Sequence, residues 1–93
     1  MNISISKHAA KRMRERNISE IMVSAAINFG ERIYAKNSLY YFLGKKAVSK
    51  MQQLFLPDNP DKWQGVVIVC DSKSGTMLTC FKNKNWLKRI RHH

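Results

Sequence analysis

The sequence predicts an α+β domain in which two N-terminal helices pack on one face of an antiparallel sheet of about four strands. Two observations favour this class. Helical spacing of apolar residues is clearest in the first third of the chain, and short runs of strand-favouring residues follow it. The 93 residues are expected to form one domain, with a helical part at 6–30, a sheet part at 31–81 and a basic tail at 82–93.

The two expected helices each begin after a serine whose side chain can cap the helix. The first covers 5–17 with Ser6 as its cap residue and a narrow apolar stripe. The second follows Ser19 and ends before Gly30, a residue type that commonly stops a helix in a left-handed conformation. Its apolar residues have the i, i+3, i+4, i+7 spacing of one helical face: Met22, Ala25, Ala26 and Phe29.

Four short runs of strand-favouring residues predict two hairpins. The strands are expected at 32–35, 39–43, 65–70 and 76–81. Asn37 supplies the turn of the first hairpin, and 71–75 form the turn of the second. The third run is apolar throughout, which predicts a central strand buried on both faces. Between the hairpins, 45–56 fit a short helix that Pro57 ends, and 57–64 form the longest loop.

The positive charge is concentrated at the two ends of the chain. Lys and Arg total 17 against 6 Asp and Glu, so the formal net charge is +11. Segment 1–16 holds five basic residues with one acid, and 81–93 holds five with none. This surplus favours a polyanionic partner, either nucleic acid or an acidic protein, and the two ends would form one continuous basic surface if the fold brought them together. The alternative is a solvated surface that only keeps the protein soluble.

Several classes of function are disfavoured by what the sequence lacks. No apolar run approaches the roughly 20 residues that span a bilayer, and the N-terminus does not have the apolar core of a secretory signal. We therefore expect a cytoplasmic protein without a membrane partner. Cys70 and Cys80 are expected to be buried free thiols, and neither a metal nor another cofactor is expected.

The first candidate site is on the first helix. His8, Arg12 and Glu15 are spaced i, i+4 and i+7 and therefore share one stripe, with Arg16 at its edge. Arginines can hold a phosphate with two hydrogen bonds and stabilise charge that develops on it, while an imidazole takes or gives a proton. The alternative is an ordinary surface histidine beside salt bridges within the helix.

The second candidate is Thr79 on the last strand, which is either an ordinary strand residue or a hydroxyl aimed at a site. Other side chains could donate hydrogen bonds to nucleic acid: Lys45, Lys46, Lys82, Asn83, Lys84, Lys88 and Arg89. One face of the strand that holds Tyr40, Tyr41 and Phe42 must be core, and its other face could stack a base.

The basic tail combines charge with an apolar side. Trp86, Leu87 and Ile90 have helical spacing, so the tail forms either a short helix or a docked extended segment. A tryptophan left in water would forgo roughly 1.5 to 3 kcal/mol of burial. We therefore expect Trp86 to dock on the domain and to place the tail's charges beside the first helix.

Four stretches together resemble the domain-of-unknown-function family 4258 over roughly 4–85. They are SKHA at 6–9 followed by Arg12, Met13, Arg16, Ile18 and Ser19, then YFLGKK at 41–46, GVVIV at 65–69 and LTCFKN at 78–83. The sequence departs from the family pattern at Cys80 and Phe81, where valine and tyrosine or similar residues are expected, and in the long loop before Trp63.

The resemblance implies a fold shared with the small toxin-like ribonucleases of the barnase, EndoU, colicin and RelE type. Those enzymes cleave RNA without a metal, with the 2′-hydroxyl as nucleophile. On this basis His8 would be the acid or base, Arg12 and Arg16 would clamp the phosphate, and Thr79 would contact it from the last strand. Two hypotheses follow. The first is a metal-independent endoribonuclease with an acidic antitoxin as partner, and the second is a non-catalytic module that binds nucleic acid or an acidic protein.

Overall fold

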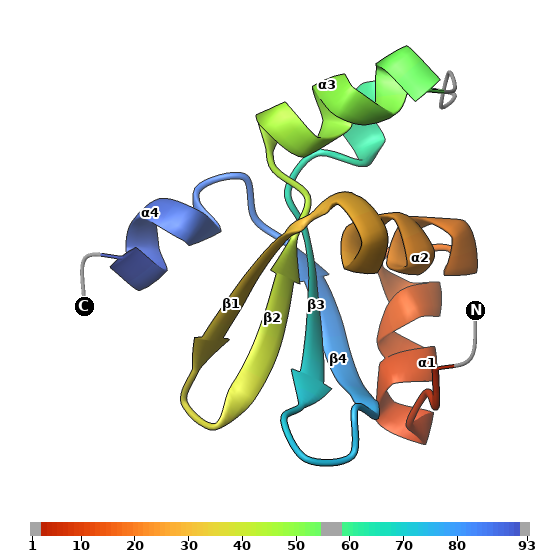
Figure 1. The fold of residues 1–93 in the computed structure, drawn as a ribbon. Helices are drawn as coiled ribbons and strands as arrows, with labels where there is room; N and C mark the ends of the chain where they lie inside the picture. The colour runs from red at the N-terminus through yellow and green to blue at the C-terminus, as the bar shows by residue number, and fades with distance from the viewer. Residues whose placement is uncertain (1–2, 55–58, 92–93) are drawn as a thin grey trace.

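The fold is a four-stranded antiparallel sheet with helices around it, as the computed structural model shows for residues 3–54 and 59–91 (Figure 1). Each strand pairs with the next one along the chain, so the sheet order is β1-β2-β3-β4. The strands are β1 (Glu31–Ala35), β2 (Ser38–Phe42), β3 (Val66–Asp71) and β4 (Met77–Lys82). The predicted class and the two predicted hairpins are therefore confirmed.

The turns of both hairpins contain residues with positive φ. Lys36 and Asn37 have φ values of 51° and 62°, the pair of left-handed residues that matches the twist of a two-residue hairpin. Asn37 was predicted to make this turn, and Lys36 shares the same conformation. In the second turn Gly75 has a φ of 77°, and the carboxylate of Asp71 accepts a hydrogen bond from the Ser74 backbone N–H at 2.8 Å.

The two N-terminal helices are α1 (Lys7–Glu15) and α2 (Glu20–Phe29). Ser6 and Ser19 cap them as predicted, since each hydroxyl oxygen accepts a hydrogen bond from a backbone N–H in the first turn. Helix α2 ends before Gly30 as predicted, but the expected left-handed conformation was wrong, because the φ of Gly30 is −72°. Space requires the glycine instead, since a Cβ there would lie 2.4 Å from the backbone oxygen of Ala26.

A third helix connects the hairpins. It is α3 (Lys45–Leu54), which agrees with the short helix expected between them. Its predicted end at Pro57 lies outside the described residues, as does the beginning of the predicted loop. The described remainder of that loop contains a short 3₁₀ helix, η1 (Pro60–Lys62).

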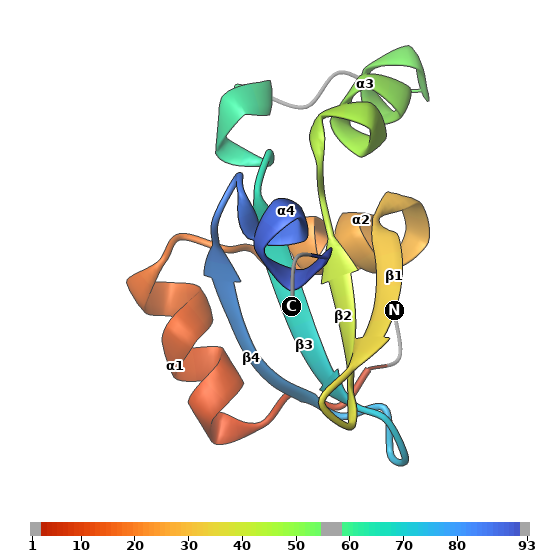
Figure 2. The same ribbon diagram turned by 90° about the vertical axis from the view of Figure 1, so that its left-hand side faces the viewer.

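The two N-terminal helices pack on one face of the sheet, as predicted, but a further helix lies on the other face. Helix α2 covers one face, and α1 runs along the edge strand β4 (Figures 1 and 2). Helix α4 (Trp86–Arg91) lies over the opposite face (Figure 2). The helical alternative for the tail is therefore the one the structure adopts.

Two apolar cores result from this arrangement. The larger core lies between the sheet and the N-terminal helices, and its fully buried members include Ala9, Val23, Leu43, Ile68 and Met77. The smaller core lies under α4: Phe42, Val67, Val69 and Trp86. Strand β3 contributes to both cores, which confirms the prediction that this run is buried on both faces.

Trp86 docks on the sheet as predicted, but the charges of α4 do not lie beside the first helix. Its ring is 5.0 Å from the Tyr40 ring and 5.7 Å from the Phe42 ring, measured between centroids. This contact fixes α4 on one side of the sheet, while α1 lies on the other side of it (Figure 1). The reason is the alternation of side chains along β2, which directs Tyr40 and Phe42 away from the larger core.

Candidate nucleic-acid interface

Helix α1 is held against the edge strand β4 by hydrogen bonds near both of its ends. At the start, the Ser6 N–H donates to the Met77 carbonyl at 3.1 Å, and the Ser6 hydroxyl donates to the Leu78 carbonyl at 3.3 Å. After the last turn, the Arg16 guanidinium donates to the Cys80 carbonyl at 2.7 Å. We call the surface formed by α1, its flanking residues Ser6 and Arg16, and β4 the α1–β4 edge.

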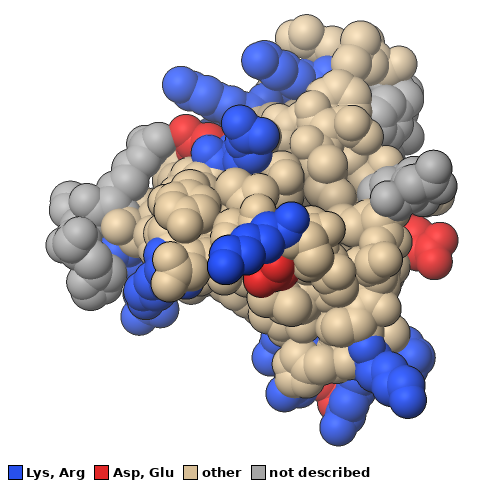
Figure 3. Space-filling model, turned by 60° about the horizontal axis from the view of Figure 1, so that its bottom comes forward, with Lys and Arg blue, Asp and Glu red and all other residues tan. Residues whose placement is uncertain are grey.

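The outer side of this edge is strongly basic. Its cationic residues on α1 and at the C-cap are Lys7, Lys11, Arg12, Arg14 and Arg16. The one acid in this segment is Glu15. Lys and Arg side chains gather over α1 in the lower right of Figure 3, apart from the other basic groups visible on this face. The edge is therefore a cationic surface on a rigid support.

Arg12 already has an anionic partner. Its guanidinium donates to the Glu15 carboxylate at 2.5 Å, and both side chains are partly exposed. The hydrogen bond from Arg12 lowers the pKa of Glu15 below its ordinary value. A phosphate that binds Arg12 would therefore share the guanidinium with this carboxylate or displace it.

Arg16 has a structural role that the sequence does not reveal. One of its N–H groups bonds the Cys80 carbonyl, and a guanidinium carries five N–H donors. The side chain is exposed, so the remaining donors can still reach a ligand. Arg16 thus connects the helix to the strand and can bind an anion at the same time.

No hydrogen bond or ion pair joins His8 to Thr79 in the described part of the chain. His8 is exposed on α1, and its imidazole makes neither a hydrogen bond nor an ion pair among the described residues. Thr79 is half-buried on β4 and pairs with Val69. Neither residue lines the hollows beside α1, α2 and α3 in the described part of the chain.

A β-bulge decides which way Thr79 points. The pairing shifts between Val69 and Cys70, so Met77 and Cys80 both reach the larger core although simple alternation would separate them. Thr79 pairs with Val69 of the smaller core, so its side chain is on the α4 side of the sheet. Helix α1 packs Ala9 into the larger core, on the other side.

The other predicted nucleic-acid contacts meet at the far end of the sheet. The Gly65 N–H donates to the Leu43 carbonyl at 2.7 Å, and the Asn83 N–H donates to the Gly65 carbonyl at 2.8 Å. These bonds place the chain around Lys45 and Lys46 close to the chain around Lys84. A Cβ on Gly65 would lie 2.9 Å from the Lys84 nitrogen, so glycine permits this approach.

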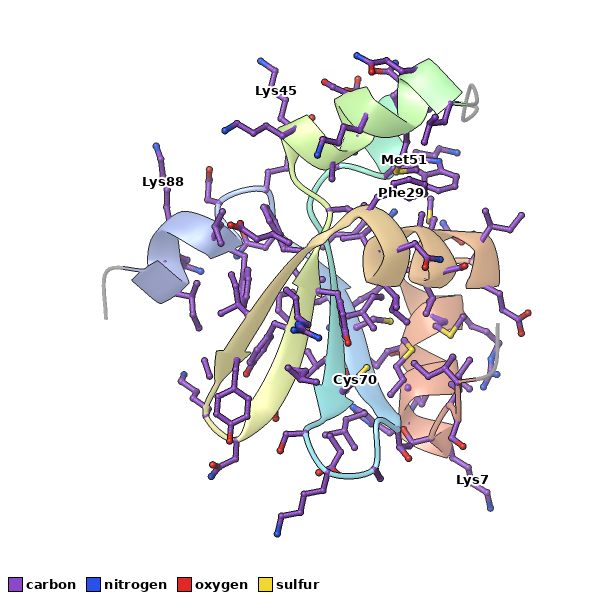
Figure 4. The ribbon with its side chains drawn as sticks, viewed as in Figure 1. Lys7, Phe29, Lys45, Met51, Cys70 and Lys88 are labelled. Carbon is purple, nitrogen blue, oxygen red and sulfur yellow. The ribbon has the colours of Figure 1, made fainter. Side chains whose placement is uncertain are left out.

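Helix α4 adds cations to the same end of the sheet, and the side-chain oxygen of Asn83 already accepts a hydrogen bond there. Lys88 and Arg89 are exposed on α4. Figure 4 shows Lys45 and Lys88 projecting from the upper part of the molecule, and Lys7 projecting at the opposite end. The Asn83 side-chain oxygen accepts a hydrogen bond from the Asn85 N–H at 3.0 Å, which stabilises the loop before α4.

The predicted contacts therefore fall into two basic regions. The first region is the α1–β4 edge, and the second surrounds the start of α3 and α4. Lys82, exposed at the end of β4, pairs with Val66 of the larger core and so lies on the α1 side. Lys50 was not among the predicted contacts, although its i, i+4 spacing from Lys46 was a usable signal.

The cysteines and the acidic residues give no metal site in the described part of the chain. No group of three or more His, Cys, Asp or Glu side chains is placed there to hold a metal ion. Cys70 and Cys80 are both buried free thiols, as predicted, and burial raises the pKa of each thiol. Among the described helices, none has the length and apolar composition needed to cross a bilayer.

Comparison with protein families identifies the class. The model of the family described as a domain of unknown function, DUF4258, matches residues 5–81. The chain therefore belongs to the DUF4258 family, as the motifs indicated. Comparisons with curated proteins and with solved structures found no match.

Proposed function

We propose that the protein is a small RNA-binding domain that holds the phosphate backbone on the α1–β4 edge. The observation that supports this most directly is the fixed position of α1: hydrogen bonds from Ser6 and Arg16 attach it to β4 while its cations remain at the surface. Cations on a rigid support lose less entropy on binding than cations on a mobile segment. A net charge of +11 adds long-range attraction for the polyanion.

Salt dependence of RNA binding tests this proposal. The variant K7Q/K11Q/R14Q removes three cations from α1 without touching the bonds that attach the helix. Each lost phosphate contact should make the slope of log K against log salt shallower by about 0.7 for single-stranded RNA. We therefore expect a slope shallower by about 2 for this variant, measured by fluorescence anisotropy with a labelled oligonucleotide.

A matched control separates a specific surface from general charge. The variant K36Q/K62Q/K73Q lowers the net charge by the same three units at exposed sites away from α1. It should keep the wild-type slope within experimental error. Equal slopes in the two variants would refute the α1–β4 edge as the binding surface, and tight binding of acidic proteins without any RNA binding would favour the acidic-protein alternative.

Metal-independent RNA cleavage is the second candidate function. The exposed imidazole of His8 favours it, because in the described structure His8 lies one turn from Arg12 and its side chain has no bonded partner. In this reaction a base takes the proton of the 2′-hydroxyl, whose oxygen attacks phosphorus. The bond from phosphorus to the 5′-oxygen then breaks, and an acid gives that oxygen a proton. The products are a 2′,3′-cyclic phosphate and a 5′-hydroxyl.

The roles in this candidate reaction follow the sequence prediction. His8 would be the acid or base, Arg12 and Arg16 would stabilise the charge on the phosphate, and Thr79 would contact it from β4. Because Thr79 is on the α4 side of the sheet, the RNA would have to pass around the edge of β4 to touch both His8 and Thr79.

Cleavage assays in excess chelator distinguish the two candidates. For an enzyme, His8→Ala abolishes formation of the cyclic phosphate while RNA affinity changes less than about twofold, since one exposed imidazole contributes little binding energy. Wild-type protein that binds RNA and leaves it intact would eliminate the enzyme and keep the binding domain. Residual cleavage of equal rate in His8→Ala would show that His8 is not the catalytic group.

A further inference from the structure

The second basic region contains a concave site, which we call the α3 hollow. It lies between the end of α2 and the start of α3 and has a volume of about 470 Å³. This volume lies within the range of about 300 to 1,000 Å³ that is usual for small-molecule sites. Its lining residues are Phe29, Gly30, Glu31, Phe42, Gly44, Lys45, Lys46, Ala47 and Lys50.

The walls of the hollow are closely packed at two glycines. A Cβ on Gly30 would lie 2.8 Å from the Phe42 carbonyl oxygen, and a Cβ on Gly44 would lie 2.8 Å from the Phe42 ring. The Phe42 ring in turn packs on Trp86, with a centroid distance of 5.7 Å. The shape of the hollow is therefore set by the sheet, by two glycines and by the docked α4.

The charge of the hollow is predominantly positive. Lys45, Lys46 and Lys50 line it against one acid, Glu31. These lysines are exposed, and within the described residues none of them makes an ion pair. Three ammonium groups around one concave surface repel each other and concentrate positive potential, so a bound anion would relieve the repulsion.

We propose that the α3 hollow binds a phosphate monoester of the size of a nucleoside monophosphate. The phosphate dianion would lie among the three lysines, and the remainder of the ligand would lie against Phe29 and the edge of Phe42. Glu31 at the wall disfavours a ligand that is anionic throughout and favours one whose negative charge is confined to one end. A free nucleotide and the terminal phosphate of an RNA strand both have this chemistry, and the second source rests on the proposed RNA-binding function.

Titration with AMP and with adenosine tests the site, with binding followed by isothermal calorimetry and by backbone amide NMR shifts. Wild-type protein should bind AMP and should bind adenosine at least about tenfold more weakly, because adenosine lacks the phosphate. The largest NMR shifts are expected at Gly30, Gly44 and the first turn of α3. Equal affinity for AMP and adenosine, or no AMP binding at millimolar concentration, overturns the proposal.

Two charge-matched variants locate the binding. K45Q/K46Q/K50Q should weaken AMP binding by at least about tenfold, because it removes the groups that pair with the phosphate. K36Q/K62Q/K73Q loses the same charge elsewhere and should keep the wild-type affinity within twofold. Both variants should keep the wild-type melting temperature, since the substituted lysines are exposed. Equal weakening in both variants overturns the proposal in favour of general charge attraction.

Oligonucleotides distinguish the two sources of the phosphate. If the source is RNA, a 5′- or 3′-phosphorylated strand should bind more tightly than the same strand with hydroxyl ends, and K45Q/K46Q/K50Q should lose that advantage. If the source is a free nucleotide, AMP should bind while the strands show no preference. The proposed RNA-binding function is tested separately by K7Q/K11Q/R14Q. That function can therefore fail while the hollow still binds AMP, and RNA binding at the α1–β4 edge can hold while the hollow does not bind AMP.

Discussion

Replacement of Trp86 by alanine tests how the tail contributes to the fold. The indole is 7% exposed and contacts the rings of Tyr40 and Phe42. It also closes the smaller core, which has only a few buried members. Trp86→Ala would leave a cavity between α4 and the sheet, or would let α4 leave the sheet and expose that face to water.

The expected magnitude follows from the buried area. A tryptophan that is almost fully buried removes roughly 200 Å² of surface from water, which corresponds to about 5 kcal/mol at about 25 cal/mol per Å². This is an upper value, because the unfolded chain already hides part of that area. Large aromatic residues replaced by alanine in cores cost about 3 to 5 kcal/mol. We expect Trp86→Ala to lower the free energy of unfolding by about 3 kcal/mol or more.

Urea denaturation followed by fluorescence and circular dichroism measures this change. The buried Trp63 remains as the fluorescent reporter in the variant. In a domain of this length each kcal/mol shifts the melting temperature by about 4 to 8 °C, so Trp86→Ala should lower it by about 12 °C or more. Lys88→Ala, an exposed change on the same helix, is the control and should stay within about 0.5 kcal/mol of wild type.

The reasoning would be refuted by a variant that unfolds at the wild-type urea concentration with the wild-type slope. That result would mean that Trp86 does not pack on the sheet in solution. A variant with normal stability but a smaller slope would instead indicate that α4 leaves the sheet without loss of the rest of the fold.

Three further predictions concern the edge strand, the second turn and the thiols. Arg16→Ala should cost about 1 to 3 kcal/mol of stability, measured by urea denaturation, because the Cys80 carbonyl loses a charged donor. Hydrogen bonds from Ser74 lower the pKa of Asp71, so the stability that the Asp71 carboxylate contributes is lost as pH falls through that lowered pKa. In Asp71→Asn the melting temperature should therefore fall less steeply in acid than in the wild type. Burial raises the pKa of Cys70 and Cys80 above the ordinary 9.0, so the folded state holds the thiol protons more tightly than the unfolded state does. The free energy of unfolding should therefore fall as pH rises above about 9. Thiol reagents should label the folded protein slowly at about pH 8.

Each of these predictions has a distinct contrary result. Arg16→Ala with unchanged stability would mean that the bond to the strand contributes nothing in solution. Parallel melting curves for Asp71→Asn and wild type between about pH 2 and pH 6 would exclude the carboxylate as the acid-sensitive group. Labelling of the native protein as fast as that of the unfolded protein would place the thiols at the surface rather than in the core.

Local signals in the sequence were sufficient for most of the secondary structure. Serine caps, helical spacing and the uninterrupted apolar run of β3 act over a few residues, so they predict an element without knowledge of its neighbours. The two capped helices, the two hairpins and the short helix between them were found in this way. The left-handed conformation predicted for Gly30 was wrong: glycine is required there because the backbone oxygens of Ala26 and of Phe42, which is distant in the sequence, leave no room for a Cβ.

The sequence alone determined that the protein is a strongly basic α+β domain with cations at both ends of the chain. Only the tertiary structure decided where those cations lie and which of them already have partners. The bond from Arg16 to Cys80 spans 64 positions and depends on the packing of α1 against β4. The bulge beside Val69 determines the face on which Thr79 lies, because a shift of one residue in a strand moves side chains to the opposite face. The α3 hollow likewise exists only because the pairing of β1 with β2 brings the end of α2 beside the start of α3.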